Sequence, residues 1–322
     1  MPRDKLKVIM KPLSSEMKAI ESVINRNMSI VQPPLDSMLR CSMAGGKKLR
    51  PALIVLIGRL FKSNRRRTHI LAAAIEVLHS ATLIHDDLID DSSLRRGHRT
   101  LNATWSPGAT VLAGDYLLAR SVSLIAGLNE PRLLSILAEV LHTMSQGEIR
   151  YHYSAECKRE KAVYFRSIEA KTAALFSAAA RMTGVLAGRS RREMDILGLF
   201  GREFGIAYQV VDDILDITEA ESRLGKPSGS DLAQGTITLP VICHIERGND
   251  DKLINKILSG RGTVGDTRKI IRLIRKSGAI ADALQEAGLH ARKAKRALSK
   301  LPAGTANESL RELIDYIIAR KH

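Results

Sequence analysis

The stretch LIHDDLIDDSSLRRGHRT, residues 83–100, is an apolar run that ends in acidic residues and continues into a turn with paired arginines. Asp86, Asp87 and Asp90 stand at positions i, i+1 and i+4, so on a helix they share an arc of roughly a quarter turn. Because no basic residue lies among them, the three carboxylates repel one another. A bound multivalent cation relieves that repulsion, and hard oxygen ligands suit Mg²⁺, which bridges carboxylates to phosphates.

A second acidic cluster with the same spacing lies in the apolar run YQVVDDILDI, where it comprises Asp212, Asp213 and Asp216. Gln209 precedes Asp212 by three residues and therefore lies on the same helix face. One such cluster is usually a solvated helix face. Two copies predict instead that facing helices of a bundle hold metal ions between their inward side chains.

The composition favours helix over strand. The chain has 322 residues, of which 44% are hydrophobic and only 4% aromatic, and Leu, Ile and Ala are abundant. Length alone suggests about two domains, although one large domain is compatible with it. We therefore expect an all-α bundle of ten or more helices in a single domain spanning residues 1–322.

Hydrophobic periodicity and turn residues divide the chain further. No stretch reads as a convincing strand, and Arg65-Arg66-Arg67 is expected to form a short turn between helices. Four of the expected helices span residues 4–29, 68–91, 162–187 and 193–218.

The net charge of +16 raises nucleic acid as a partner. The basic residues are nevertheless spread over many helices with few aromatics for base stacking, so we expect no nucleic-acid partner. Most of the excess charge is expected to form a solvated surface, and such a surface could also favour anionic substrates or anionic lipid surfaces. Cys41, Cys157 and Cys243 form neither a metal pattern nor a disulfide framework. With no signal-like N-terminus and no charge-free run long enough to span a membrane, we expect a cytoplasmic protein.

Three basic segments are candidate phosphate sites. Gly45-Gly46 with Lys47 and Arg50 precede a helix that begins near Pro51, and Arg95-Arg96 follow the first acidic cluster. The segment GKPSGSDLAQGTITLP, residues 225–240, contains Lys226 and is the least helix-like part of the chain. A polar loop that directly follows the second cluster can act as a lid over a site. Each of these signals is weak by itself.

Together these segments resemble one protein family. The motifs GGKKLRP at 45–51, LIHDDLIDDSSLRRGHRT at 83–100, Lys171-Thr172, YQVVDDILD at 208–216 and GKPSGSDLAQGTITLP at 225–240 are similar, in order, to those of the trans-isoprenyl diphosphate synthases, or polyprenyl synthetases. The resemblance covers about residues 40 to 240. It implies the all-α isoprenoid synthase fold, a bundle around a central cavity. It also implies head-to-tail condensation of isopentenyl diphosphate with an allylic diphosphate, usually by a homodimer.

The resemblance also implies roles for particular residues. About three Mg²⁺ ions would be held by Asp86, Asp90, Asp212 and Asp216, with Asp87 in support, and would neutralise charge on the leaving diphosphate. The residues expected to be catalytic are Asp86, Asp87, Asp90, Lys171, Asp212, Asp213 and Lys226. Isopentenyl diphosphate would be held without metal by Lys47, Arg50, His79 and Arg96. The allylic diphosphate would be held by Arg95, Lys171, Thr172, Gln209 and Lys226.

Product length is expected to depend on the helix face below Asp86. Short-chain relatives often carry a bulky aromatic residue at the position of Ala81 or Thr82, and both residues here are small. We therefore expect a long-chain product, from hexaprenyl to decaprenyl, for a quinone side chain, with a peripheral membrane contact for its release. An alternative is a shorter product. Arg150 and Tyr151 stand where long-chain relatives usually have Leu-Gln, and Tyr151 could form the floor of the cavity and restrict the product to geranylgeranyl or farnesylgeranyl length.

Three rival functions are weaker matches. A terpene cyclase typically has a different second metal motif. It also lacks the binding site for isopentenyl diphosphate to which Lys47 and Arg50 would contribute. A non-catalytic subunit of a heteromeric synthase tends to lose an aspartate cluster, whereas both are complete here. A basic nucleic-acid binder leaves the paired acidic clusters unexplained, and its binding would depend steeply on salt.

Overall fold

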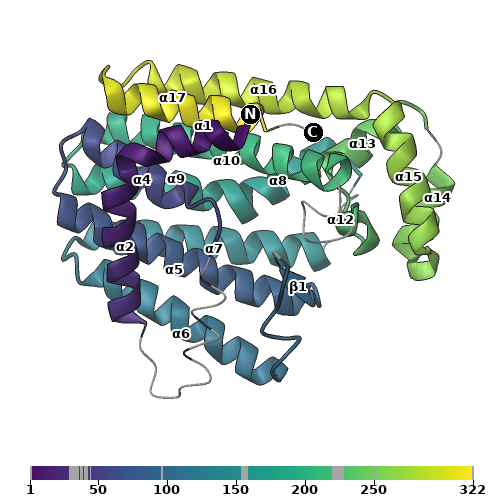
Figure 1. Cartoon of the computed structure of the whole chain (residues 1–322), viewed down its shortest axis with the longest axis horizontal. Coiled ribbons are helices and arrows are strands. Elements are labelled where there is room, and N and C mark those ends of the chain that lie inside the picture. Colours follow the sequence, from purple (N-terminus) through teal and green to yellow (C-terminus); the bar gives the residue numbers. More distant parts are fainter. Residues whose placement is uncertain are drawn as a thin grey trace.

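The computed structural model of the chain describes residues 2–28, 36, 39, 43, 45–95, 97–153, 159–219, 228–249 and 251–320. Helices dominate this part of the chain (Figure 1), and its sheet structure is one two-stranded hairpin. The expected all-α class is therefore confirmed.

The helices and strands follow one another along the whole chain. The N-terminal half contains α1 (Pro2–Met10), the 3-10 turn η1 (Lys11–Leu13), α2 (Ser14–Asn27), α4 (Leu49–Leu60), α5 (Arg65–Ile89), β1 (Leu94–Arg95), β2 (His98–Arg99), α6 (Pro107–Ala126) and α7 (Pro131–Tyr153). The C-terminal half contains α8 (Lys161–Ile168), the π-helical turn η2 (Glu169–Ala173), α9 (Ala174–Leu186), α10 (Arg191–Thr218), α12 (Ser230–Ala233), α13 (Leu239–Glu246), α14 (Asp251–Lys256), the π-helical turn η3 (Ile257–Arg261), α15 (Val264–Lys276), α16 (Ala279–Leu298) and α17 (Thr305–Ile318).

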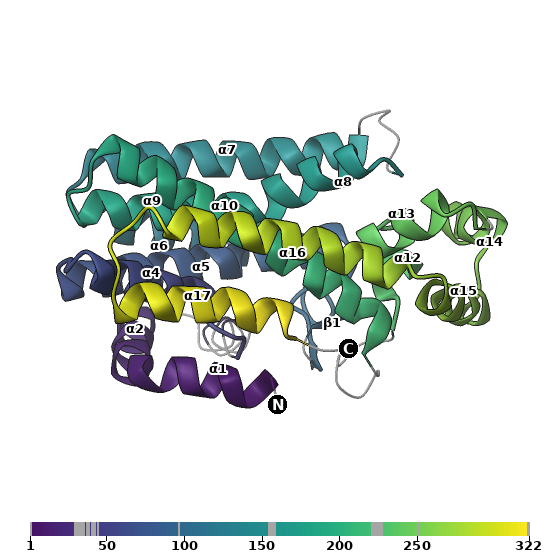
Figure 2. The ribbon, with the colours of Figure 1, turned by 90° about the horizontal axis from the view of Figure 1, so that it is seen from above.

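The two helices that carry the acidic clusters, α5 and α10, run in the same direction through the bundle (Figures 1 and 2). The α5 helix packs on α6, α4 and α2, whereas α10 packs on α9, α16 and η2. One hydrophobic core extends from Ile9 to Ile317. The carboxyl ends of α5, α7 and α10 consequently lie at the same end of the molecule, so residues distant in sequence meet there.

Side-chain caps explain where several of these helices begin. Ser190 starts α10 with a capping box, in which its hydroxyl accepts from the Glu193 N–H and Glu193 accepts from the Ser190 N–H. Asn64 caps α5 by accepting from the Arg67 N–H at 3.1 Å. The run 65–67 is therefore the first turn of α5, and the expectation of an inter-helix turn there was wrong.

Other expected elements also differ from the structure. The single helix expected over 4–29 is broken into α1, η1 and α2, because Pro12 supplies no backbone N–H. The expectation of no strand was likewise wrong. Leu94 pairs with Arg99 and Arg95 with His98 in a short antiparallel hairpin. Gly97, in its turn, has a φ of +79°. The helix expected over 162–187 is interrupted by the wider turn η2.

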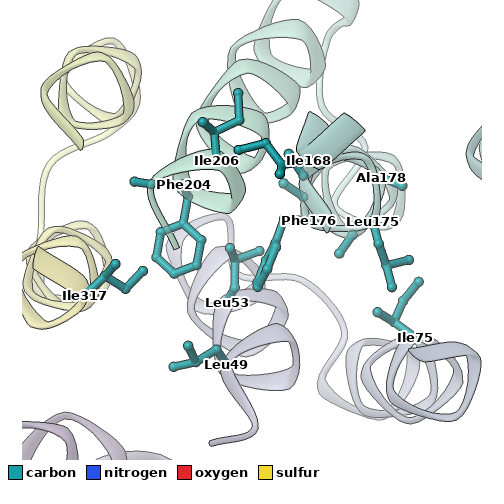
Figure 3. Packing of buried hydrophobic residues seen from close by; sticks show 14 of the residues in the cluster. Leu49, Leu53, Ile75, Ile168, Leu175, Phe176, Ala178, Phe204, Ile206 and Ile317 are labelled. Carbon is teal, nitrogen blue, oxygen red and sulfur yellow. The ribbon is translucent and has the colours of Figure 1, made fainter. Parts of the chain in front are cut away.

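The bundle interior is tightly packed on the α5 face below the first cluster. Ile75 lies about three turns below Asp86 on the same helix face, and its side chain is fully buried. Figure 3 shows Ile75 directed toward Leu175 of α9, which is also buried. Both side chains belong to the hydrophobic core at this level of the bundle.

Helix α6 is unusually exposed for its composition. By length and composition alone, this helix is long and apolar enough to cross a membrane, with a mean hydropathy of 1.3. Only 33% of its most apolar stretch is buried inside the molecule. Val111 and Leu112 are exposed on its surface, and Leu134 is exposed on the neighbouring α7. This chain therefore leaves part of an apolar helix face uncovered.

Candidate active site

The last turn of α5 presents the first acidic cluster. Asp86 Oδ2 lies 3.6 Å from Lys171 Nζ, and Glu148 Oε1 on α7 lies 3.2 Å from the same ammonium. Desolvation raises the pKa of Asp86 to about 6, with further contributions from the negative charges of Glu148 and Asp90 and opposition from Lys171. Lys171 therefore offsets only part of the effect that burial and the neighbouring carboxylates have on the Asp86 pKa.

Lys171 and Thr172, on η2, lie between the two acidic clusters. Lys171 reaches Asp86, whereas the Thr172 hydroxyl donates to Gln209 Oε1 at 2.7 Å. Gln209 in turn donates to Asp213 Oδ1 at 2.8 Å. Residues from three sequence motifs are therefore joined in one continuous set of contacts.

A contact between the segments that follow the two clusters agrees with this arrangement. Gln234, immediately after α12, has its side-chain nitrogen 3.4 Å from the Ser92 hydroxyl, which follows the first cluster. Asp90 closes α5, and its N–H donates to the Asp86 carbonyl at 2.8 Å. The two clusters accordingly belong to one end of the bundle and border a common region.

In the second cluster each carboxylate has a different protein partner. Asp213 is buried and accepts from the Tyr164 hydroxyl at 2.7 Å, while burial raises the pKa of the Asp213 carboxyl above its usual value. Asp216 accepts from the Ser230 hydroxyl at 2.9 Å. Asp212 lies on the outer side of the cluster and pairs with Arg320.

Arg320 comes from the end of the chain and is a residue that sequence reasoning missed. Its Nη2 donates to Asp212 Oδ1 at 2.9 Å, and its guanidinium lies 5.4 Å from the centre of the Tyr208 ring. The side chain is only 9% exposed, and its Nη1 has no hydrogen-bond partner. A buried guanidinium with a free donor beside a carboxylate provides one potential anion-binding group.

The basic residues of the first half have distinct positions. Arg95 Nε donates to Asp87 Oδ1 at 2.8 Å, so in this state it pairs with the first cluster. Arg50 lies over the Phe176 ring, 4.3 Å from its centre, and Phe176 packs on Tyr208 with ring centres 5.8 Å apart. Arg50 and Arg320 therefore lie against two neighbouring rings in the interior of the site.

The glycine turn before α4 has the backbone geometry that its sequence indicated. Gly45 and Gly46 adopt φ values of 77° and 81°. Lys47 follows them and is partly buried. Lys48, which sequence reasoning did not single out, pairs with Glu76 of α5 at 3.0 Å. This ion pair joins the turn to the helix that carries the first cluster.

The remaining candidate residues lie along α5 and α7. His79 is two turns before Asp86 on α5, Ala81 is buried, and Thr82 donates its hydroxyl to the His79 carbonyl at 2.8 Å. Tyr151 is near the end of α7, where its hydroxyl faces Thr236. Arg96 and Lys226 lie outside the described residues. Of the expected lid, residues 225–227 also lie outside them, whereas residues 228–240 are described and include the short helix α12.

The carboxylates fit a divalent cation that shares its coordination with other ligands. Within the described ranges, no three His, Cys, Asp or Glu side chains converge closely enough to hold a metal unaided. Mg²⁺ commonly uses one or two carboxylates, water and substrate phosphates rather than a complete protein cage. The raised pKa of Asp86 marks a place where a nearby cation would stabilise the ionised carboxylate.

The fold and the paired clusters define a helical prenyltransferase, and comparisons identify the family. Residues 32–274 match the family model described as polyprenyl synthetase. The chain is 34% identical over 327 residues to heptaprenyl diphosphate synthase component 2 of Geobacillus stearothermophilus, covering 99% of this chain and 100% of the relative. The chain belongs to the polyprenyl synthetase family, and it is a polyprenyl diphosphate synthase, a trans-prenyltransferase.

Two solved structures agree with that assignment. A polyprenyl synthase from Caulobacter crescentus CB15, complexed with calcium and isoprenyl diphosphate, superimposes with a TM-score of 0.92 at 34% identity and covers 98% of each chain. A decaprenyl diphosphate synthase from Rhodobacter capsulatus superimposes with a TM-score of 0.88 at 32% identity, covering 98% of this chain and 99% of the other. The isoprenoid synthase fold is therefore confirmed.

Proposed function

We propose that the protein condenses isopentenyl diphosphate with an allylic diphosphate in a Mg²⁺-dependent reaction and makes a long all-trans polyprenyl diphosphate. The expected length is hexaprenyl to decaprenyl, and the product would supply a quinone side chain. The observation that carries the reaction is the set of contacts from Asp86 through Lys171 and Thr172 to Gln209 and Asp213. Relatives named heptaprenyl and decaprenyl synthase support the longer product.

The proposed division of labour follows the charges of the side chains. About three Mg²⁺ ions, held by Asp86, Asp90, Asp212 and Asp216, would stabilise the departing diphosphate. Lys171 would supply a fixed positive charge to that diphosphate, because nearby carboxylates keep its pKa raised despite the opposing effect of burial. The remaining contacts to the allylic diphosphate would come from Arg95, Thr172, Gln209 and Lys226.

Isopentenyl diphosphate would bind without metal on the other side of the site. Fixed cations near the amino end of α4 suit a diphosphate, since guanidinium groups bind phosphate oxygens in pairs. The residues assigned to this role are Lys47, Arg50, His79 and Arg96. Buried apolar side chains around the reacting carbons would keep water away from the allylic cation.

The alternative of a geranylgeranyl or farnesylgeranyl product assigns the limit to Tyr151. Its hydroxyl faces Thr236, and Lys171 and Glu148 are close enough to influence its pKa. A floor for the growing chain must lie far from the diphosphate, so this location favours the longer product. The small Ala81 and Thr82 support the same conclusion.

A homodimer in the cytoplasm is the proposed assembly and location. Val111 and Leu112 of α6 are exposed apolar side chains that a second copy would cover. A single domain is proposed because one core unites the chain from Ile9 to Ile317. The cytoplasm is proposed because the three widely spaced cysteines of the sequence form no disulfide framework.

The decisive experiment incubates the purified chain alone with Mg²⁺, labelled isopentenyl diphosphate and allylic starters of increasing length. Chromatography of the dephosphorylated products should show all-trans chains of six to ten isoprene units, the range proposed above. An Asp86→Asn variant, which removes one proposed metal ligand, should lose most of the activity. Consumption of a starter without isopentenyl diphosphate would identify a cyclase, and no product from the chain alone would contradict the proposal.

A further inference from the structure

The helical segment over 161–186 contains one turn of π-helix, η2, at Glu169–Ala173. The N–H of Ala174 donates to the Glu169 carbonyl five residues earlier, which makes this turn wider than its neighbours. Lys171 and Thr172 lie within it. The only two residues of this helical segment assigned to the diphosphate site are therefore carried by its irregular turn.

Two neighbouring helices press closely on the π-turn. A Cβ added to Gly147 of α7 would lie 2.4 Å from the Ala170 Cβ, and one added to Gly205 of α10 would lie 2.6 Å from the Ala173 Cα. Both distances are too short for any side chain. Backbone packing from α7 and α10 thus holds the two sides of η2.

An ion pair holds the first residue of the turn. Arg202 of α10 binds Glu169 through two hydrogen bonds, Nε to Oε1 at 2.5 Å and Nη2 to Oε2 at 2.6 Å. Its third nitrogen, Nη1, donates to Glu203 Oε1 at 2.5 Å. Glu203 is buried, and its other oxygen lies 2.6 Å from His290 Nδ1 of α16. Glu169 and Arg202 have side chains that are each 39% exposed, and Arg202 links Glu169 to the buried pair of Glu203 and His290.

We propose that Glu169 and Arg202 are positioning residues for the allylic diphosphate. Their ion pair holds the π-turn in register, so that Lys171 lies beside Asp86 while Thr172 lies beside Gln209. Neither residue needs to touch the substrate. The inference rests on the proposed diphosphate site. It attributes the positions of Lys171 and Thr172 in that site to the ion pair between Glu169 and Arg202.

The test compares Glu169→Ala with Asp282→Ala. Asp282 is a matched control, because it also accepts two hydrogen bonds from one arginine, Arg247, at 2.6 and 2.8 Å, but on α16 and away from η2. We expect Glu169→Ala to lower kcat/KM for the allylic diphosphate about tenfold to a hundredfold, since small displacements of binding groups are costly. The KM for isopentenyl diphosphate should stay within about twofold of wild type for both variants.

Conservative variants and a readout without turnover separate positioning from general stability. Glu169→Gln and Arg202→Lys retain part of the contact and should show intermediate kcat/KM values. Amide exchange at Ala174, which forms the π-turn hydrogen bond, should accelerate in Glu169→Ala and remain unchanged in Asp282→Ala. Equal melting temperatures, exchange and kinetics in the two alanine variants would overturn the proposal. Failure of wild-type protein to make any product would contradict the enzyme reaction instead and leave the exchange result to decide the role of Glu169.

Discussion

Lys171 is the cation that pairs with Asp86 of the first acidic cluster. Its ammonium lies between Asp86 of α5 and Glu148 of α7, while the adjacent Thr172 reaches α10 through Gln209. Removing this single positive charge would leave Asp86, Asp90 and Glu148 to repel one another. The pKa of Asp86 should therefore change when Lys171 or Glu148 is replaced.

We expect Mg²⁺ binding to weaken as pH falls through about 6, the raised pKa of Asp86, because a protonated carboxyl is a poor ligand. Lys171→Met should move this transition to higher pH, since Lys171 lowers the Asp86 pKa. Glu148→Gln should move it to lower pH. The measurement is the Mg²⁺-induced rise in melting temperature as a function of pH, and identical profiles for the three proteins would refute the assignment.

The same pKa has a consequence for the metal-free protein. Because folding raises the Asp86 pKa from 3.8 to about 6, the folded state binds the proton more tightly than the unfolded state. This group's contribution to the free energy of unfolding is thus most favourable at low pH and decreases as pH rises through that interval. Asp86→Asn should remove this part of the pH dependence.

Arg320 provides a second prediction at the residue scale. Its guanidinium is the partner of Asp212, so it competes with any cation for that carboxylate. Arg320→Gln should lower the metal-free free energy of unfolding by about 1–2 kcal/mol and should tighten Mg²⁺ binding, measured by calorimetry. Arg311→Gln is the control, because Arg311 bonds only to Asn307 of its own helix among the contacts described here. Unchanged or weaker Mg²⁺ binding in Arg320→Gln would contradict this competition.

At the scale of the element, α5 combines two tasks along its length. Its last turn presents Asp86, Asp87 and Asp90, whereas its lower turns pack into the core through side chains such as Ile75. Local spacing determines which residues share the Asp86 face. The size of the side chains on the turns below should then limit how far a product can extend.

Ala81→Phe and Thr82→Phe should both shorten the product. Thr82 lies one turn below Asp86, and Ala81 is buried on an adjacent stripe of α5, so a phenyl ring there must occupy interior space. Overpacking should also cost about 1–3 kcal/mol of stability. Ala281→Phe, at an exposed position on α16, is the control. Chromatography of the products checks this, and unchanged chain length in both α5 variants would refute the depth assignment.

At the scale of the whole molecule, the exposed face of α6 requires an explanation that one chain does not supply. Leu112 is 69% exposed although its helix is among the most apolar of the molecule. Val111, the preceding residue on α6, is also exposed. Covering such a surface with a second copy would remove apolar area from water, which stabilises association.

Leu112→Asp should therefore convert a dimer to a monomer. A carboxylate in an apolar interface loses hydration without gaining a partner. Sedimentation velocity of wild type and variant checks the prediction. Leu273→Asp, a substitution at an exposed leucine of α15 outside this surface, should leave the association unchanged. A monomeric wild type, or an equally dimeric Leu112→Asp variant, would contradict the proposed interface.

Much of the fold and the principal candidate residues could be predicted from the sequence. Apolar periodicity located α5 and α10 to within a few residues, and equal spacing placed three aspartates on one face of each helix. Those features depend on local backbone geometry, which repeats every few residues. The family-typical motifs added the activity, because their order along the chain is itself specific.

Only the tertiary structure decided which residues complete the site. Asp212 and Arg320 are 108 residues apart in sequence, and no local pattern connects them. The π-turn at 169–173 is closely approached by Gly147 and Gly205, which belong to two other helices. Helical spacing determined which side chains leave a helix together, whereas packing between helices determined what those side chains meet.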